Sequence, residues 1–198
     1  DVYTVGKSGM FDGFEYEKKH DHDFMDFYIG TSRDCVNFDK SWVHNRKPLV
    51  PRGPAGSFDK DGIKPPAQIL TLNDEHWIYY GGMNERHYSR GRHLNIGLAK
   101  LPLDRVIGQA ASAKEGIIIT KPFTLEGDTL EVNVDAKSGW VKVELLDAAG
   151  DVISGKRTTH VDELRLTPKL KLQKHKGKTV KLKFTLQNAK VYAFQVKN

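Results

Sequence analysis

The sequence predicts an all-β protein, and two observations carry that prediction. Apolar residues alternate with polar ones at a period of two in several stretches of the second half, as in half-buried strands. No window keeps apolar residues at a sustained spacing of three and four, so no amphipathic helix is expected. Turn-forming residues separate the apolar runs, which favours a β-sandwich or jelly roll over a parallel sheet.

In the first half the strand signals are short and are interrupted by long loops. Residues 26–34 (DFYIGTSRD) predict a strand that runs into a turn. Residues 68–73 (QILTLN) and 76–82 (HWIYYGG) predict a hairpin across the Asn-Asp pair at their junction. Residues 94–101 (LNIGLAKL) predict a further strand.

The second half carries a denser series of strand patterns, with leucine, valine or phenylalanine at every second position. The predicted strands span residues 130–134, 141–145, 164–166, 170–172, 180–186 and 191–196. Turn sequences such as DAAGD at 147–151 separate them. Strands spaced in this way predict a β-sandwich or jelly-roll domain.

Composition divides the chain into two predicted domains, residues 1–110 and residues 111–198. The first is rich in Gly, Asp, His and aromatic residues, and the second in Val, Leu, Lys and Thr. The net charge of +6 is uneven: residues 1–100 hold 14 Lys and Arg against 14 Asp and Glu, and the remainder hold 17 against 11. The small-residue segment 96–112 is typical of a connector.

Several classes of protein are excluded or disfavoured. No run of about 18 apolar residues is present, so we expect no membrane span. Cys35 is the only cysteine, so no internal disulfide can form, and a thiol packed in a core is the favoured interpretation over a reactive one. Nothing at Asp1 resembles a secretory signal, so we expect that in a secreted protein the signal has already been removed. We expect no cofactor and no metal.

One short motif resembles a known family. Residues 32–38 (SRDCVNF) resemble the strand-end turn of five-bladed β-propeller glycosidases, whose blades often carry Ser-x-Asp-Gly-x-x-Trp. Cys35 stands where that motif has Gly, and Phe38 where it has Trp. The turn is therefore expected to be tighter or differently packed here.

Further segments extend the resemblance through the first half. Residues 47–70 (KPLVPRGPAGSFDKDGIKPPAQIL) resemble a propeller loop that delivers an acid before a strand along the central channel. The segment WIYYGG at 77–82, then His87 and IGLAKLPLDR at 96–105, complete the match.

The second half resembles a different part of the same proteins. Residues 117–155 and 176–196 resemble the C-terminal β-sandwich of proteins similar to glycoside hydrolase family 32. The resemblance covers nearly the whole chain, and its two halves occur in the family's order. It implies the C-terminal portion of a secreted family 32/43-like protein, with the last blades of a five-bladed β-propeller followed by a β-sandwich.

The resemblance also implies that part of the propeller lies outside this chain. A five-bladed propeller needs roughly 250 to 300 residues, and about 110 precede the sandwich here. An open partial propeller would expose strand edges and an apolar face. We therefore expect a second chain or an N-terminal segment to complete it, or partners to cover the edges.

Glycoside hydrolysis needs two carboxylates across the scissile bond. In the resembled family the nucleophile and a second Asp come from early blades, and no matching motif is present, so the catalytic residues are unknown and this chain alone is expected to be inactive. Asp59 and Asp61 are the candidates for substrate binding, although loop acids often only form turns. Tyr80 and His87 are further substrate-binding candidates beside them.

Other polar and aromatic residues have two interpretations each. His93, like His87, either bonds a sugar hydroxyl or metal or lies in a solvated loop. The cluster at 20–23 (HDHD) is dense in metal ligands, but neighbours on a strand point to opposite faces, so a solvated loop is favoured. Trp77 and Tyr79 are expected to pack between blades, and Tyr80, on the opposite face, to face a channel.

A basic stretch near the C-terminus suggests a second kind of ligand. Residues 165–183 contain eight Lys and Arg and no carboxylate, with Lys alternating with Leu. Such a face is usually solvated, but it can attract polyanions. The candidate residues for binding a polyanion are Arg165, Lys169, Lys171, Lys174, Lys176 and Lys178. Aromatic residues are not interleaved with the basic ones, which disfavours nucleic acid as a ligand, and a polyanionic glycan ranks first.

Two functional hypotheses follow. The first is the C-terminal part of a glycoside hydrolase-like, carbohydrate-active protein. The second is a non-catalytic extracellular protein, lectin-like or structural, with a basic polyanion-binding face. Turnover of glycosides separates the two.

Overall fold

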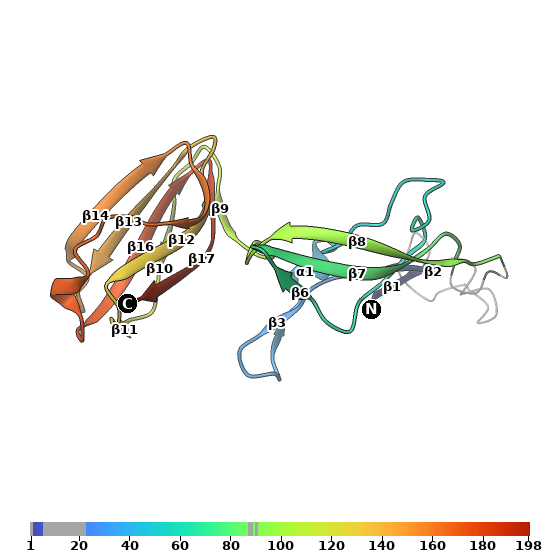
Figure 1. The fold of residues 1–198 in the computed structure, drawn as a ribbon, viewed down its shortest axis with the longest axis horizontal. Coiled ribbons are helices and arrows are strands. Elements are labelled where there is room, and N and C mark those ends of the chain that lie inside the picture. The colour runs from blue at the N-terminus through green and yellow to red at the C-terminus, as the bar shows by residue number, and fades with distance from the viewer. Residues whose placement is uncertain (1, 6–22, 87–88, 90) are drawn as a thin grey trace. The chain divides into compact units, whose positions relative to one another are not determined.

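The computed structural model describes residues 2–5, 23–86, 89 and 91–198, and the described chain is all-β. It divides into two compact units, unit 1 (Asp1–Leu101) and unit 2 (Pro102–Asn198) (Figure 1). No helix among the described residues is long and apolar enough to cross a membrane. The part of the chain that the structure describes includes two short helices, α1 (Ser41–His44) and the 3-10 turn η2 (Gln173–His175).

Unit 1 is built on one six-stranded sheet. Its strands are β1 (Val2–Val5), β2 (Asp23–Asp26), β5 (Gly62–Lys64), β6 (Leu70–Leu72), β7 (Glu75–Met83) and β8 (Leu94–Pro102). The order is β1-β2-β5-β7-β6, and β8 pairs with the other edge of β7. All neighbours with a stated register are antiparallel except β2 and β5, which are parallel. The described sheets of unit 1 do not form a closed propeller.

The β6–β7 hairpin confirms the turn predicted from the sequence. Asn73 and Asp74 connect the strands with φ of +48° and +66°, the left-handed conformation that Asn and Asp tolerate best among residues with a side chain. The pairing of Leu70 with Trp77 and of Leu72 with Glu75 fixes which side chains share a face. Because strand side chains alternate, the two faces of this sheet differ in their surroundings.

One face of the unit 1 sheet is buried and the other is exposed. Val50, Ile63 and Ile78 form a small core on the first face. The second face presents apolar side chains of three neighbouring strands to solvent: Leu70, Leu72, Tyr79, Leu94, Ile96 and Leu98. Ile96 is the most exposed of them, at 82%. We call this surface the apolar face.

A small hairpin, β3 (Thr31–Ser32) with β4 (Phe38–Asp39), carries the motif that resembles a propeller turn. The Asp34 carboxylate accepts hydrogen bonds from the Ser32 hydroxyl at 3.0 Å and the Asn37 N–H at 2.8 Å. Hydrogen bonds, chiefly from the Asn37 backbone, hold the pKa of Asp34 well below its usual range. Cys35 is exposed with φ of +59°, so the expectation of a core thiol is wrong.

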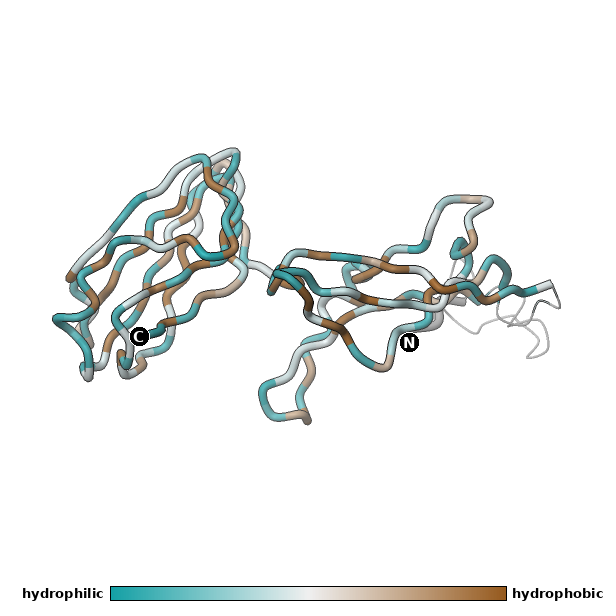
Figure 2. Tube along the Cα trace, in the orientation of Figure 1, coloured by the Kyte–Doolittle hydropathy of each residue, from teal (hydrophilic) through white to brown (hydrophobic). Residues whose placement is uncertain are grey.

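Unit 2 consists of two antiparallel sheets (Figure 1). The first contains β10 (Gly116–Ile119), β11 (Phe123–Thr124), β13 (Trp140–Leu146), β14 (Val152–Thr159) and β16 (Thr179–Gln187). The second has the order β15-β12-β17-β9 and contains β9 (Gln109–Ala111), β12 (Thr129–Asp135), β15 (Asp162–Leu166) and β17 (Ala189–Lys197). Polar and apolar residues alternate along these strands (Figure 2).

A single apolar core joins the two sheets of unit 2. Val132 and Val134 of β12 pack with Val143 of β13 and Phe184 of β16, all of them almost fully buried. The expected strands at 130–134, 141–145, 164–166, 180–186 and 191–196 are confirmed.

Two expectations for unit 2 differ from the structure. Residues 170–172 form no strand; Leu172 is instead buried at the start of η2. We expected the second domain to begin at residue 111, but β9 pairs with β17, and the compact unit begins at Pro102. The strand that pairs with β9 lies at the far end of the chain, so local composition does not reveal that β9 belongs to unit 2.

Candidate functional site

The candidate acids lie together on the loop of residues 51–61 that leads into β5. Asp59 and Asp61 are both buried, each with 6% exposure. Two glycines make room for the first of them: a Cβ on Gly53 would collide with the Asp59 carboxylate, and one on Gly82 with the Asp59 Cβ. The close packing of this loop against β7 therefore depends on residues without a side chain.

Asp59 is bonded by two hydroxyl groups. The Ser57 hydroxyl donates to Asp59 Oδ1 at 2.7 Å, and the Tyr80 hydroxyl donates to Oδ2 at 2.8 Å. Burial, assisted by Asp59, raises the pKa of Tyr80 to about 12. Phe58 stacks beside the Tyr80 ring, with the centroids 6.2 Å apart. Tyr80 is therefore a neutral hydrogen-bond donor at neutral pH.

Asp61 is held by ion pairs and by the backbone. Lys60 Nζ lies 2.5 Å from Asp61 Oδ2, and Arg86 Nε lies 3.6 Å from Oδ1. The Asp61 N–H donates to the Met83 carbonyl at 3.1 Å, and the Met25 N–H donates to the Asp61 carbonyl at 3.2 Å. These bonds fix Asp61 between β2 and β7.

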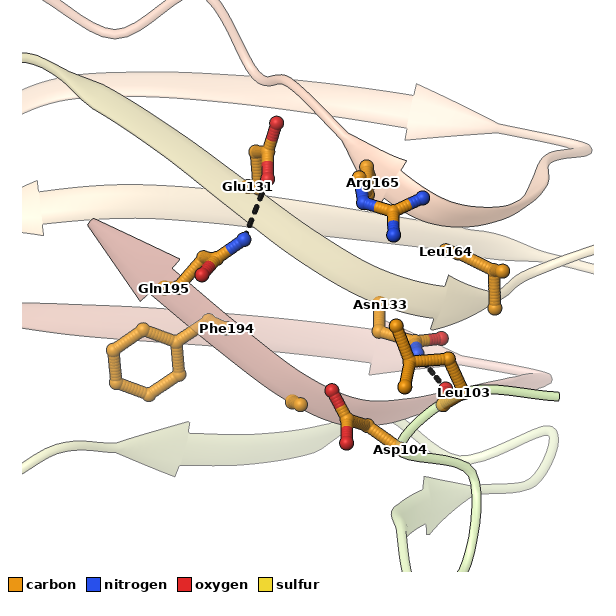
Figure 3. Close-up of a pocket in the computed structure, with 9 residues that line it drawn as sticks. Leu103, Asp104, Glu131, Asn133, Leu164, Arg165, Phe194 and Gln195 are labelled. Atoms are coloured by element: carbon orange, nitrogen blue, oxygen red, sulfur yellow. Dashed lines mark hydrogen bonds between the residues drawn. The ribbon is translucent and has the colours of Figure 1, made fainter. Parts of the chain in front are cut away.

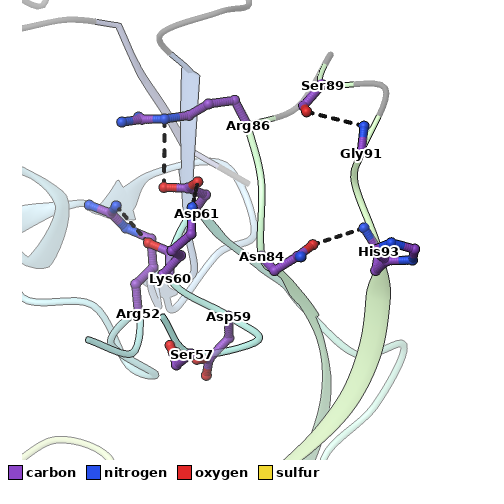
Figure 4. A network of polar contacts seen from close by, with 10 residues as sticks. All are labelled: Arg52, Ser57, Asp59, Lys60, Asp61, Asn84, Arg86, Ser89, Gly91 and His93. Atoms are coloured by element: carbon purple, nitrogen blue, oxygen red, sulfur yellow. Dashed lines mark hydrogen bonds and ion pairs between the residues drawn. The ribbon is translucent and has the colours of Figure 1, made fainter. Parts of the chain in front are cut away.

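A third acid, Asp26, pairs with Arg52. We call Asp26, Asp59 and Asp61 with Arg52, Lys60 and Arg86 the carboxylate cluster; Figure 4 shows all of these residues except Asp26. Arg52 Nε donates to Asp26 at 2.7 Å, and its guanidinium and that of Arg86 both lie over the Phe24 ring, at 4.0 and 3.3 Å from the centroid. In the Arg52–Asp26 and Arg86–Asp61 ion pairs, the carboxylate is the buried partner and the guanidinium is the more exposed one.

The aromatic residues of β7 divide between the two faces of the sheet. Trp77 and Tyr79 lie on the apolar face with ring centroids 6.4 Å apart, and Lys100 lies over the Trp77 ring at 3.6 Å. Tyr80 lies on the opposite face, beside Asp59. A Cβ on Gly97 of β8 would collide with the Tyr80 ring, so that glycine lets the ring lie flat on the sheet.

The histidine candidates contribute little to the described cluster. His87 lies outside the described residues, as do residues 20–22 of the HDHD segment, whereas Asp23 is buried at the start of β2. The backbone N–H of His93 donates to the Asn84 side chain at 2.8 Å. Within the described parts of the chain, no group of three or more His, Cys, Asp or Glu is placed to hold a metal ion.

The six candidate polyanion-binding residues are all exposed, but they do not follow one strand. Arg165 lies on β15. Lys169, Lys171, Lys174, Lys176 and Lys178 lie in the segment between β15 and β16. The Lys171 N–H donates to the Ser154 hydroxyl on β14, whereas Lys176 Nζ donates to the Asn198 side chain. The alternation of Lys with Leu was therefore a misleading strand signal over this loop.

Sequence reasoning missed two groups of polar residues. Arg52, Lys60 and Arg86 surround the predicted acids, and only Lys60, adjacent to Asp61, offered a local signal. Glu131 and Asn133 of β12 are the polar residues that alternate with core residues in this strand, and the structure buries both. Their covering side chains come from segments distant in sequence.

In chemical terms, the carboxylate cluster combines buried carboxylate acceptors with half-buried cations, beside the Tyr80 hydroxyl that bonds Asp59. This set can bond the hydroxyl groups of a polar ligand. No protein-family model, curated protein or solved structure matches the chain.

Proposed function

We propose that this chain is the C-terminal portion of a secreted, glycoside hydrolase-like, carbohydrate-active protein of the family 32/43 type. In this proposal unit 1 supplies the last blades of a five-bladed β-propeller and unit 2 is the β-sandwich that follows it. The early blades, with the acids that cleave the glycosidic bond, lie outside this chain. Asp59, Asp61 and Tyr80 belong to the carbohydrate site.

The observation that carries the proposal is the Asp59–Tyr80 pair beside Asp61. Asp59 accepts two hydrogen bonds, and a carboxylate offers about four acceptor positions, so capacity remains for a ligand hydroxyl. Arg52 and Arg86 provide charge-assisted donors at the same place. Sugars present adjacent hydroxyls that both donate and accept, which suits this mixed set.

The apolar face supports the part of the proposal that concerns further blades. Tyr79 is 44% exposed, Leu94 54% and Ile96 82%, and they lie on adjoining strands. A contiguous apolar surface of this kind normally packs against another element. We propose that the occupant is the sheet of a further blade, because a flat sheet face packs well against a second sheet. Intact mass and N-terminal sequencing of native material will show whether more polypeptide accompanies the chain.

Hydrolysis tests the assignment of the catalytic acids. We expect the chain by itself to give no turnover of β-fructosides, arabinosides or galactosides, because the early-blade acids are missing. Robust turnover by this chain would refute that assignment.

Binding tests the assignment of the site. Asp59→Asn removes the charge of the carboxylate while keeping its shape, and we expect it to weaken glycan binding about tenfold. Asp74→Asn, at an exposed turn of the same unit, is the matched control and should bind as the unaltered chain does. Equal affinity in all three proteins would exclude Asp59 from the site.

A second candidate function rests on the exposed lysines of unit 2. Among the described residues, the side chains of Lys169, Lys171, Lys174 and Lys178 form no ion pair, and their charge is left for an external anion. We propose as the alternative a non-catalytic, lectin-like or structural role in which these cations bind a polyanionic glycan. Binding should then weaken with salt and with charge reversal at Lys174, Lys176 and Lys178. Indifference to both changes would exclude it.

A further inference from the structure

A polar cavity lies in unit 2, and none of the residues of the carboxylate cluster lines it. It is a groove of about 320 Å³ over the outer face of the sheet that contains β12, β15 and β17 (Figure 3). Its floor carries Glu131 and Asn133, and its sides carry the 103–104 segment and Arg165. This volume is at the lower end of the range for small-molecule sites.

The groove is fixed by hydrogen bonds rather than by loose loops. The Asn133 side chain donates to the Leu103 carbonyl at 2.7 Å, and Arg105 Nε donates to Asn133 Oδ1 at 2.9 Å. Arg105 also pairs with Asp162 at 2.6 Å and donates to the Val134 carbonyl at 3.2 Å. The side of the groove formed by residues 103–104 is thus tied to β12 and β15, so the cavity is formed in advance of any ligand.

Glu131 provides a preorganised carboxylate at the floor. Its oxygens accept from Lys197 Nζ at 2.5 Å and from Gln195 Nε2 at 2.7 Å. The bonds from Lys197, and then from Gln195, lower the pKa of Glu131, so the group is ionised at neutral pH. These two bonds leave acceptor positions on the carboxylate.

Other polar groups approach the floor from different strands. Figure 3 shows Arg165 of β15 and Gln195 of β17 on either side of Glu131, and Asp104 at the opposite end. Leu103 and Leu164 add apolar surface at the side. The groove therefore combines two carboxylates, one guanidinium, two primary amides and a small apolar area.

This combination determines the class of ligand. A polyanion is disfavoured by Glu131 and Asp104, and a cation by Arg165 and Lys197. A nucleobase would need an aromatic platform, but the Phe194 ring at the groove packs toward Phe184 instead. A compact neutral ligand rich in hydroxyls remains, because hydroxyls donate to carboxylates and accept from guanidinium and amide groups.

We propose that this groove is a second saccharide-binding site, which holds one or two sugar units on unit 2. It goes beyond the site proposed in unit 1 and uses none of its residues. The groove is shallow and offers no stacking ring, so the expected dissociation constant is on the order of 1 mM. Such a site would help retain a chain of sugar units through avidity rather than through high affinity.

Titration of the full ¹⁵N-labelled chain with D-fructose, D-galactose, L-arabinose and sucrose tests this proposal. We expect at least one sugar to shift the amide resonances of β12, β15 and β17 around the groove in a saturable manner. Arg165→Gln should weaken this binding about tenfold, because it removes a charged donor. Lys121→Gln, which removes an exposed charge of the same unit outside the groove, should leave it unchanged.

A second variant guards against loss of structure at Arg165. Asp104→Asn alters an exposed turn residue on the opposite side of the groove and should also weaken binding, with an otherwise unchanged spectrum. Saturable shifts confined to residues near Asp59 would support the proposed function in unit 1 and overturn the groove site. Absence of any sugar-induced shift in unit 2, or equal affinity in Arg165→Gln and Lys121→Gln, would also overturn it.

Discussion

Replacement of Arg105 by methionine probes the contacts that hold the first residues of unit 2 to strands β12 and β15. The guanidinium of Arg105 donates to Asn133 Oδ1 and to the Val134 carbonyl and pairs with Asp162, and its side chain is only 11% exposed. Methionine retains an apolar stem of similar length but provides no donor. The variant therefore leaves two buried acceptors on β12 without this partner.

The size of the effect follows from these contacts. Each buried acceptor left unsatisfied costs about 1–3 kcal/mol. Asp162 contributes less to the loss, because Lys137 Nζ still lies 2.5 Å from its other oxygen. We therefore expect Arg105→Met to lower the free energy of unfolding of unit 2 by about 3 kcal/mol.

Lys137→Met is the matched control, because Lys137 pairs with the same carboxylate but is 66% exposed. An exposed ion pair contributes at most about 1 kcal/mol, so this variant should change stability little. Native-state hydrogen exchange of the β12 amides measures the loss of stability in both variants. The protection factors should fall on the order of 100-fold in Arg105→Met and by less than about tenfold in Lys137→Met. Equal losses in the two variants would refute the argument that burial decides the cost.

Four further predictions use other parts of the chain. The pKa of Tyr80 is raised to about 12, so the stabilisation from its neutral phenol should be complete below pH 10.0 and lost as the pH rises toward 12. In a phenolate absorbance titration, the difference between the unaltered chain and Tyr80→Phe should have its midpoint near pH 12. A midpoint near pH 10 would contradict this prediction. Cys35→Gly should raise stability by up to about 1 kcal/mol in denaturant unfolding, because Cys35 has φ of +59°; a loss of stability would count against backbone strain. Phe184→Ala, at 1% exposure in the core of unit 2, should cost about 3–5 kcal/mol by the same assay, and a cost below about 1 kcal/mol would be inconsistent with this packing. Ile96→Lys on the apolar face should alter the free energy of unfolding of the isolated chain by less than about 0.5 kcal/mol. The same variant should self-associate less in sedimentation experiments. A large destabilisation would mean that the apolar face is covered.

The strands that the sequence predicted best are those with a strict alternation. In β12, β13 and β16 every second residue enters the core, so the period of two is visible without knowledge of any partner. The edge strand β14 was not predicted, because it contains Gly155, Lys156 and Arg157 and most of its residues stay exposed. An edge strand is fixed by hydrogen bonds to its neighbour, which leave no apolar pattern in the sequence.

Only part of the candidate site could be predicted from the sequence. Asp59, Asp61 and Tyr80 were identified from their places in the sequence, and the structure brings Asp59 and Tyr80 into hydrogen-bond contact. Their cationic neighbours gave no local signal: Arg52 stands at the start of the same loop but pairs with Asp26 of β2, and Arg86 follows β7 in the sequence.

The sequence by itself thus determined that this protein is built of β-strands, where most of the long strands run, and that the Asn73–Asp74 pair makes a turn. These properties depend on residues a few positions apart, namely the alternation of side chains and the backbone conformations that Asn and Asp tolerate. The tertiary structure alone decided that Glu131 and Asn133 are buried on a polar face, and that one face of the β7 sheet is covered while the other is bare. The physical reason is that burial of a sheet face depends on which distant segment packs against it, as Arg105 packs against Asn133. The alternation of polar and apolar residues in a strand is the same whether or not that face is covered.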